Sequence, residues 1–130
     1  GNKGHLDFKI NWTGWYGNNP EIEITTNKID YNTLSIRFLE DQRHWIFIPQ
    51  KITLMGFKNA KWIVIEKRII NNLTENYNKN IQTYSFISKR FTKFTNVKIL
   101  IQNLAELPSW KKRKSKKPMI MIDEIELRNK

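Results

Sequence analysis

Cysteine is absent from this 130-residue chain, so neither disulfide bonds nor thiolate metal sites can form. The two histidines, His5 and His44, are isolated, and no group of His, Asp and Glu has the spacing of metal ligands. The five glycines form no Gly-rich phosphate loop. Every apolar run falls well short of the roughly 20 residues that span a bilayer. The sequence therefore carries no motif of a metalloenzyme, a nucleotide-binding enzyme or a transmembrane helix.

Acidic residues are also scarce, with 12 Asp and Glu against 23 Lys and Arg, which gives a formal net charge of +11. No pair of carboxylates has the context of a hydrolase site, so no catalytic residue is predicted. Much of the positive excess lies in one block, Lys111–Lys117, with the sequence KKRKSKK. The remainder is only mildly basic, so the total charge gives weak support for nucleic acid binding.

The length and composition predict one folded domain over residues 1–130. A hydrophobic content of 39% and five Trp are typical of a chain that packs a core. The sequence begins at Gly1 rather than Met, so we expect an excised C-terminal module of a larger protein, with Gly1 left from cloning. This sequence contains no signal peptide, so any secretion signal would belong to the larger protein.

Apolar and polar residues alternate with period two in most of the chain, which is typical of half-buried β-strands. We expect strands near residues 6–10, 22–24, 34–39, 45–49, 51–57, 61–66, 81–87, 97–101 and 119–127. An alternative for residues 65–73 is a helical stripe, and Gly, Asn and Pro indicate loops at 12–20, 71–80 and 103–118. About eight short strands without a helix predict an all-β fold, a jelly-roll β-sandwich of antiparallel strands.

Three aromatic residues, Trp12, Trp15 and Tyr16, lie in the predicted loop 12–20. Aromatic rings on loops can stack on the apolar face of a sugar while polar neighbours bind its hydroxyls. The alternative is that Trp12 and Trp15 close the end of the hydrophobic core, and the sequence favours this role for them. Trp45 is expected in the core because an apolar run follows it.

The basic block Lys111–Lys117 lies between Trp110 and Pro118. Lys and Arg beside an aromatic ring could hold a polyanionic glycan or single-stranded nucleic acid. The alternative is a solvated loop between two strands, which is the commoner role of such a charge run. No signature of a nucleic-acid-binding module accompanies the block, so nucleic acid is not the expected partner.

Four segments carry a resemblance to a known family, to which Gly14–Asn19 adds GWYGNN, similar to G-Y-x-G-D-D. Phe38–Pro49 has the sequence FLEDQRHWIFIP, Asn96–Leu104 has NVKILIQNL, Pro108–Trp110 has PSW and Met119–Leu127 has MIMIDEIEL. In that order they resemble F-L-x-D-x-x-x-W-I-F-x-P, Y-V-R-V-x-A-K-N-L, P-D-W and W-L-F-V-D-E-I-E-V. These are segments of the discoidin-like domain at the C-terminus of Bacteroides-type family 20 glycoside hydrolases, the chitobiase or β-N-acetylhexosaminidase type.

This resemblance covers most of residues 12–127 and implies a galactose-binding-like jelly roll that is not itself catalytic. It also implies a periplasmic or secreted parent enzyme, whose catalytic domain would be the module's protein partner. Related modules bind sugars through loops at one end of the sandwich. A carbohydrate of the GlcNAc or galactose type would then be bound by residues of these loops, namely Asp41, Arg43, His44, Trp110, Trp15 and Tyr16.

Many related modules hold a structural calcium, and the resemblance implies that Glu124 would be its carboxylate ligand here; no other cofactor is expected. The chain departs from the family at two places. The usual N-terminal calcium loop is not recognisable, and Lys111–Lys117 replaces a Gly/His-rich loop. The expected function is carbohydrate binding without catalysis and without membrane contact. The alternatives are a polyanion-binding module that uses Lys111–Lys117 and a purely structural spacer domain.

Overall fold

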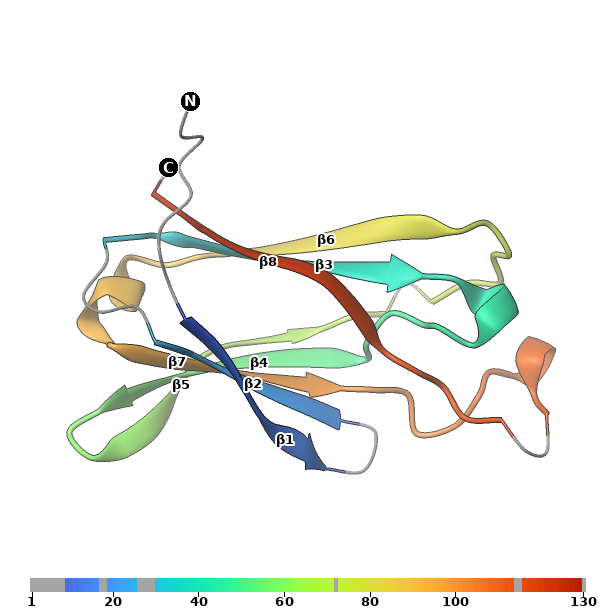
Figure 1. The fold of residues 1–130 in the computed structure, drawn as a ribbon, viewed down its shortest axis with the longest axis horizontal. Helices are drawn as coiled ribbons and strands as arrows, with labels where there is room; N and C mark the ends of the chain where they lie inside the picture. The colour runs from blue at the N-terminus through green and yellow to red at the C-terminus, as the bar shows by residue number, and fades with distance from the viewer. Residues whose placement is uncertain (1–8, 17–18, 26–29, 72, 114–115, 130) are drawn as a thin grey trace.

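The computed structural model describes residues 9–16 as backbone only, and residues 19–25, 30–71, 73–113 and 116–129 with their side chains. Within these residues, eight strands form two sheets that pack face to face (Figure 1). The strands are β1 (Lys9–Tyr16), β2 (Asn19–Thr25), β3 (Thr33–Glu40), β4 (Lys51–Lys58), β5 (Lys61–Ile69), β6 (Asn80–Ile87), β7 (Asn96–Gln102) and β8 (Met121–Arg128).

One sheet has five strands in the order β1-β2-β7-β4-β5, and the other has three in the order β6-β3-β8. All neighbouring strands are antiparallel. The β1–β2 and β4–β5 connections stay within the larger sheet, and the other connections cross between the sheets, as in a jelly roll. The predicted all-β sandwich of about eight antiparallel strands is therefore confirmed.

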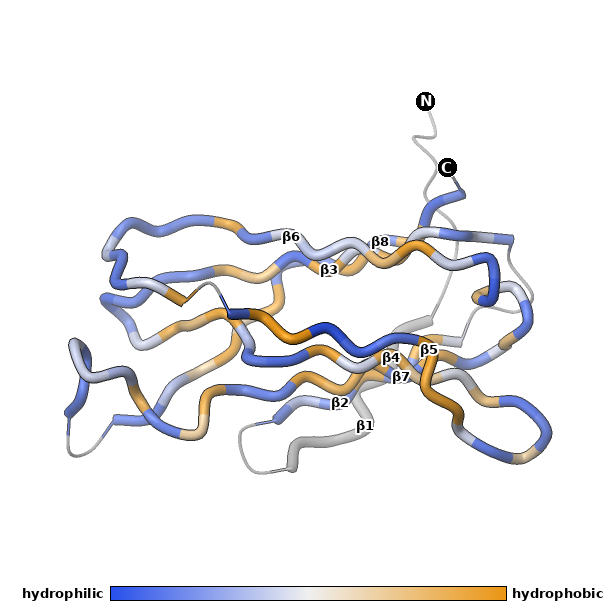
Figure 2. The backbone as a smooth tube through the Cα atoms, turned by 180° about the vertical axis from the view of Figure 1, so that it is seen from behind, coloured by the Kyte–Doolittle hydropathy of each residue, from blue (hydrophilic) through white to orange (hydrophobic). Residues whose placement is uncertain are grey.

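The alternation in the sequence corresponds directly to burial in the sandwich. In β3, Leu34, Ile36 and Phe38 are buried while Arg37 is exposed, because successive side chains of a strand point to opposite faces. Figure 2 shows the same alternation of hydrophobic and hydrophilic residues along the strands. The buried faces of the two sheets enclose one hydrophobic core, in which the rings of Tyr31 and Phe91 stack with centroids 5.1 Å apart.

The prediction of a loop at residues 12–20 is wrong in part, because β1 continues to Tyr16 and β2 begins at Asn19. Gly14 looked like a strand breaker in the sequence. In the structure it follows a register shift between Trp12 and Gly14, and the shift lets the strand continue beyond a bulge. Most of the strand predicted at residues 6–10 lies outside the described residues.

A strand predicted at residues 45–49 is also wrong. Trp45 has a φ of 61°, in the left-handed region, and it ends a 3-10 turn, η1 (Gln42–His44). The apolar residues that follow are buried, but Ile46 makes only isolated bridges, to Asp41 and Met119. At residues 65–73 the helical alternative is wrong, because β5 runs to Ile69 as a strand.

Three long connections lie at the same end of the sandwich, which we call the loop end. They are residues 41–50 between β3 and β4, 70–79 between β5 and β6, and 103–120 between β7 and β8. Figure 1 shows η1 and the short 3-10 turn η3 (Ser109–Lys111) together at this end, opposite the end of β8. A third 3-10 turn, η2 (Lys89–Lys93), lies at the other end, between β6 and β7.

Candidate ligand-binding site at the loop end

The first loop of the site is closed by its own backbone. Asp41 and Ile46 exchange two backbone hydrogen bonds, of 2.9 and 3.0 Å, and between them the Trp45 amide donates to the Gln42 carbonyl at 3.2 Å. Trp45 has a left-handed backbone, which is uncommon for a residue other than glycine and is often found at functional sites. In this turn Gln42 is buried, whereas Arg43 and His44 are exposed at the end of β3.

Gln42 connects this loop to two others although its own side chain is completely buried. Its amide nitrogen donates to the Thr74 carbonyl at 2.8 Å and to Glu40 at 3.3 Å. Its amide oxygen accepts from the indole Nε1 of Trp110 at 2.9 Å and from the backbone amide of Asn76 at 3.3 Å. An amide side chain has two donor hydrogens and two acceptor sites, so Gln42 uses its full capacity. It therefore fixes three loops in one arrangement.

Arg43 and His44 are the exposed polar side chains of this turn, and the buried Asp41 lies beneath them. The His44 ring nitrogen Nδ1 lies 2.9 Å from the Asp41 carboxylate; the His44 side chain is 72% exposed and that of Asp41 12%. Arg43, between them, is exposed. The half-buried ring of Tyr77 completes the frame, and its hydroxyl donates to the Trp110 carbonyl at 3.4 Å. Desolvation, followed by a hydrogen bond to the Glu75 carboxylate and its negative charge, raises the pKa of Tyr77.

The connection 103–120 is tied to the sandwich at both of its ends. At its start the buried Asn103 side chain donates to the Pro118 carbonyl at 3.0 Å, and the Asn103 amide donates to Asn19 at 2.8 Å. At its end Met119 exchanges backbone hydrogen bonds with Trp45 and Phe47, of 2.8 and 2.9 Å. These contacts hold the described residues of the basic block close to the loop that contains Trp45.

Three cationic side chains of the basic block gather around the indole ring of Trp45. Lys111 Nζ lies 4.5 Å from the ring centroid, Lys116 Nζ 5.0 Å and the Arg113 guanidinium carbon 5.8 Å. Lys111 is also 5.5 Å from the ring of Tyr77. Cations are attracted to the electron-rich faces of aromatic rings, so Trp45 helps to concentrate positive charge at this end of the molecule.

A pocket of about 460 Å³ opens beside this cluster. We call it the basic pocket, because four cations and one carboxylate contribute to its lining, namely Lys112, Arg113, Lys116, Lys117 and Glu106. Leu107 and Pro118 form apolar parts of the wall. The pocket volume is within the range of small-ligand sites.

The structure brings together four of the residues that the resemblance implied for sugar binding. Asp41 contacts His44 directly, Arg43 lies between them, and Trp110 is linked to the same loop through Gln42. The backbone of Trp15 pairs with Pro20, and that of Tyr16 pairs with Asn19. Their side chains lie outside the described part of the structure, so their predicted roles stay predictions.

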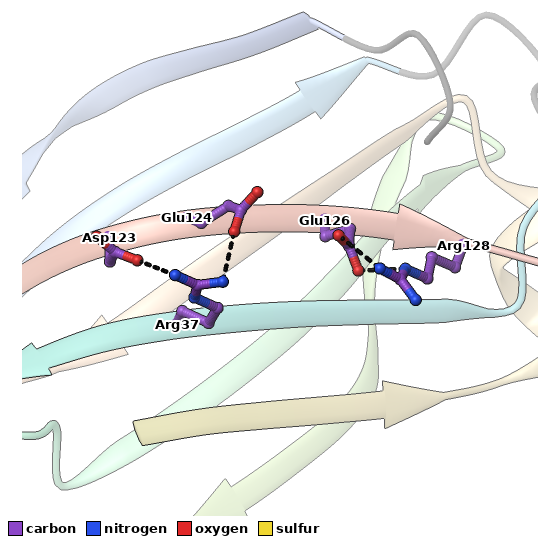
Figure 3. A network of polar contacts seen from close by, with 5 residues as sticks. All are labelled: Arg37, Asp123, Glu124, Glu126 and Arg128. Carbon is purple, nitrogen blue, oxygen red and sulfur yellow. Dashed lines mark hydrogen bonds and ion pairs between the residues drawn. The ribbon is translucent and has the colours of Figure 1, made fainter. Parts of the chain in front are cut away.

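The predicted calcium ligand Glu124 lies away from the loops, on β8 in the smaller sheet. Its carboxylate is 2.9 Å from the guanidinium of Arg37, which is also 2.6 Å from Asp123 (Figure 3). Farther along β8, Glu126 pairs with Arg128. Among the described residues no group of three or more His, Asp or Glu is arranged to hold a metal ion. The Glu124 carboxylate is thus paired with Arg37, and its calcium role stays a prediction.

Sequence reasoning missed Gln42, Tyr77 and the part that Trp45 plays at the site. A glutamine in a polar turn carries no local signal, because its hydrogen-bond partners come from residues 74–76 and 110. Trp45 was expected in the core, but it is half-buried and lies under the basic block. Only the positive charge of that block was visible in the sequence.

No family model matches the chain, and no curated protein matches its sequence. In the part of the chain that the structure describes, no helix has the length and apolar character needed to cross a membrane. We therefore infer a function from the fold, from the loop end and from the sequence segments that resemble the glycosidase module.

Proposed function

We propose that this domain is a non-catalytic carbohydrate-binding module, an accessory domain of a glycoside hydrolase of the chitobiase or β-N-acetylhexosaminidase type. The observation that carries the proposal is the hydrogen-bonded frame around Gln42. A fixed frame reduces the entropy lost when a ligand is bound, which matters for a weakly held sugar. Gln42 itself belongs to the segment Phe38–Pro49, which resembles the glycosidase module.

The residues on this frame have the chemistry that a sugar requires. Arg43 and His44 donate hydrogen bonds to ring hydroxyls, and the Asp41 carboxylate accepts them. Trp110 is half-buried and anchored through its Nε1, so an apolar face of its ring serves for stacking against a sugar. A shallow site of this kind predicts a dissociation constant of about 0.1–1 mM for a monosaccharide.

The parent chain in this proposal is a periplasmic or secreted glycosidase, and the module holds it close to its substrate. The support is the resemblance in four segments, including the closing strand at residues 119–127. Catalysis would belong to the other domain of that enzyme. We therefore expect the 130-residue domain to release no product from an aryl β-N-acetylglucosaminide.

The proposal is tested with a glycan array, followed by calorimetric titration of the domain with GlcNAc, galactose and their oligomers. Saturable binding to at least one glycan is expected. Absence of binding to every glycan on the array and in the titrations would refute the proposal.

A structural spacer that packs on a catalytic domain is the second candidate function. Exposed apolar side chains on β5 favour it, because an exposed apolar patch often marks a protein contact. These side chains include Ile63, Val64 and Ile69. If this role is the correct one, Thr substitutions at these three positions should loosen the contact between the two domains of the parent protein without affecting the loop end.

A further inference from the structure

The basic pocket specifies the chemical class of the ligand. We infer that the glycan bound at the loop end is a polyanionic polysaccharide, and that a sulfate or carboxylate group of it enters the basic pocket. This inference rests on the proposed carbohydrate-binding function. It assigns the pocket to the anionic substituent, whereas Arg43, His44 and Asp41 bind hydroxyl groups.

The charge in the pocket is not balanced by the described residues that line it. Four cationic residues and one carboxylate residue, Glu106, line the pocket, and Glu106 lies 3.9 Å from Lys112. Both partners of this ion pair are largely exposed, and exposed pairs contribute little free energy. The wall thus retains a positive excess that an anion can neutralise.

The protein backbone keeps these cations close to one another. The Lys116 amide donates to the Arg113 carbonyl at 3.0 Å, and Asn103 holds Pro118 at the base of the loop. Lys111 and Lys116 also converge on the same ring of Trp45. Like charges held at short distance repel each other, so a bound anion stabilises this arrangement. Ammonium and guanidinium groups form strong charge-assisted hydrogen bonds with sulfate and carboxylate oxygens.

The aromatic residues of the loop end distinguish a glycan from a nucleic acid. Proteins that hold single strands stack successive bases on a series of open aromatic faces. Here the cations of the basic block lie over Trp45, and Lys111 also approaches Tyr77. The rings of Trp45 and Tyr77 are thus already in contact with cations. A compact pocket beside such rings suits a single anionic group attached to a sugar.

The experiment compares three ligands of similar length by calorimetry: a heparin-derived hexasaccharide, neutral chitohexaose and single-stranded oligo-dT. The test variant is Lys112→Gln/Lys116→Gln/Lys117→Gln in the pocket. The matched control is Lys58→Gln/Lys61→Gln/Lys67→Gln, which changes three exposed lysines on the β4–β5 hairpin and lowers the net charge equally. Thermal midpoints of both variants establish that they are folded.

We expect the sulfated hexasaccharide to bind at least about tenfold more tightly than chitohexaose, the factor that one charge-assisted hydrogen bond provides. The pocket variant should lose that advantage and show a shallower dependence of affinity on salt, because fewer counterions are released. The control variant should bind the sulfated hexasaccharide within about twofold of the wild type, since its lysines are not among the residues that line the pocket and are screened by salt.

Four results would overturn the inference, and they separate its failure from that of the proposed function. Equal binding of neutral and sulfated glycans leaves carbohydrate binding intact but refutes the anionic ligand. Absence of binding to both hexasaccharides refutes the anionic ligand, and the glycan array then decides whether the domain binds any carbohydrate. Equal losses in the pocket and control variants indicate charge attraction without a site. If oligo-dT binds more tightly than the sulfated hexasaccharide and the pocket variant no longer binds it, the pocket is assigned to nucleic acid.

Discussion

The indole Nε1 of Trp110 donates a hydrogen bond of 2.9 Å to the side-chain oxygen of Gln42, across 68 positions of the sequence. The bond joins the connection that contains the basic pocket to the turn that contains Arg43 and His44. Because the Gln42 amide also holds the carbonyl of Thr74, one buried side chain determines the relative positions of all three loops. Binding at the loop end should therefore depend on a residue that no ligand touches.

Gln42→Ala should destabilise the domain by about 1–3 kcal/mol, because it leaves the indole Nε1 of Trp110 and the amide of Asn76, both partly buried, without their acceptor. Denaturant unfolding measures this change, and near-UV circular dichroism reports the altered packing of Trp110. The control is Gln50→Ala, at an exposed position, which should change the stability by less than about 0.5 kcal/mol. Equal stability of the two variants would contradict the role of Gln42.

Arg43→Ala should weaken glycan binding by about tenfold or more, because a charged donor to the sugar is lost. Since Arg43 is exposed, the thermal midpoint should remain close to that of the wild type. Arg90→Ala is the matched control, at an exposed arginine in η2 at the opposite end of the sandwich. Titration calorimetry gives the comparison, and an unchanged affinity of Arg43→Ala would remove this residue from the site.

The strands and the core could be predicted from the sequence, but the frame of the site could not. Alternation in β3 and β7 is a local signal, because each strand has one face on the core. The apolar run after Trp45 gave the wrong element, since these residues are buried in a loop that bonds to Met119 instead of a neighbouring strand.

The basic pocket illustrates the same limit. The charges of Lys111–Lys117 are evident in the sequence, but the pocket exists because Asn103 closes the base of the loop on Pro118. Asn103 forms that contact from the end of β7, and nothing in the local sequence indicates it. A long-range contact between side chain and backbone determines the shape of the pocket, so charge alone could predict attraction for anions but not where they bind.

Tyr31→Phe should change how stability depends on pH. Burial raises the pKa of the Tyr31 hydroxyl well above its ordinary value, and that hydroxyl has no hydrogen-bond partner among the described residues. In the unfolded chain the hydroxyl ionises near pH 10, whereas burial opposes its ionisation in the folded state. Ionisation of Tyr31 therefore leaves the stability of the wild type unchanged below that pH and lowers it as the pH rises above it. Thermal midpoints between pH 8 and about pH 11 should fall less steeply in Tyr31→Phe than in the wild type.

At neutral pH the same substitution removes a buried hydroxyl without a partner, and the stacking of ring 31 on Phe91 is retained. The variant should therefore be at least as stable as the wild type, by up to about 1 kcal/mol. Lysine ionisation in this pH range affects both proteins equally. Parallel pH profiles for the two proteins would contradict the account of Tyr31.

Gly56→Ala should destabilise the sandwich, because a Cβ at Gly56 would lie 2.5 Å from two ring carbons of Phe94. Overpacking of this kind costs about 1–3 kcal/mol. In the double variant Gly56→Ala/Phe94→Ala the clash is absent. Its loss of stability should therefore be smaller than the sum of the losses in the two single variants. Chemical denaturation of the two single variants and the double variant tests this coupling, and strict additivity would contradict it.

The central claim is that the loop end binds a polyanionic glycan, and amide NMR of the isotope-labelled domain during titration with a sulfated hexasaccharide tests it most directly. We predict that the shifted resonances belong to residues 41–45 and to 105–118, with saturation at one site. Residues of the β4–β5 hairpin, at positions 58–61, should remain unshifted. Shifts that are spread over the exposed lysines, or that are centred on the hairpin or on β8, would contradict the claim.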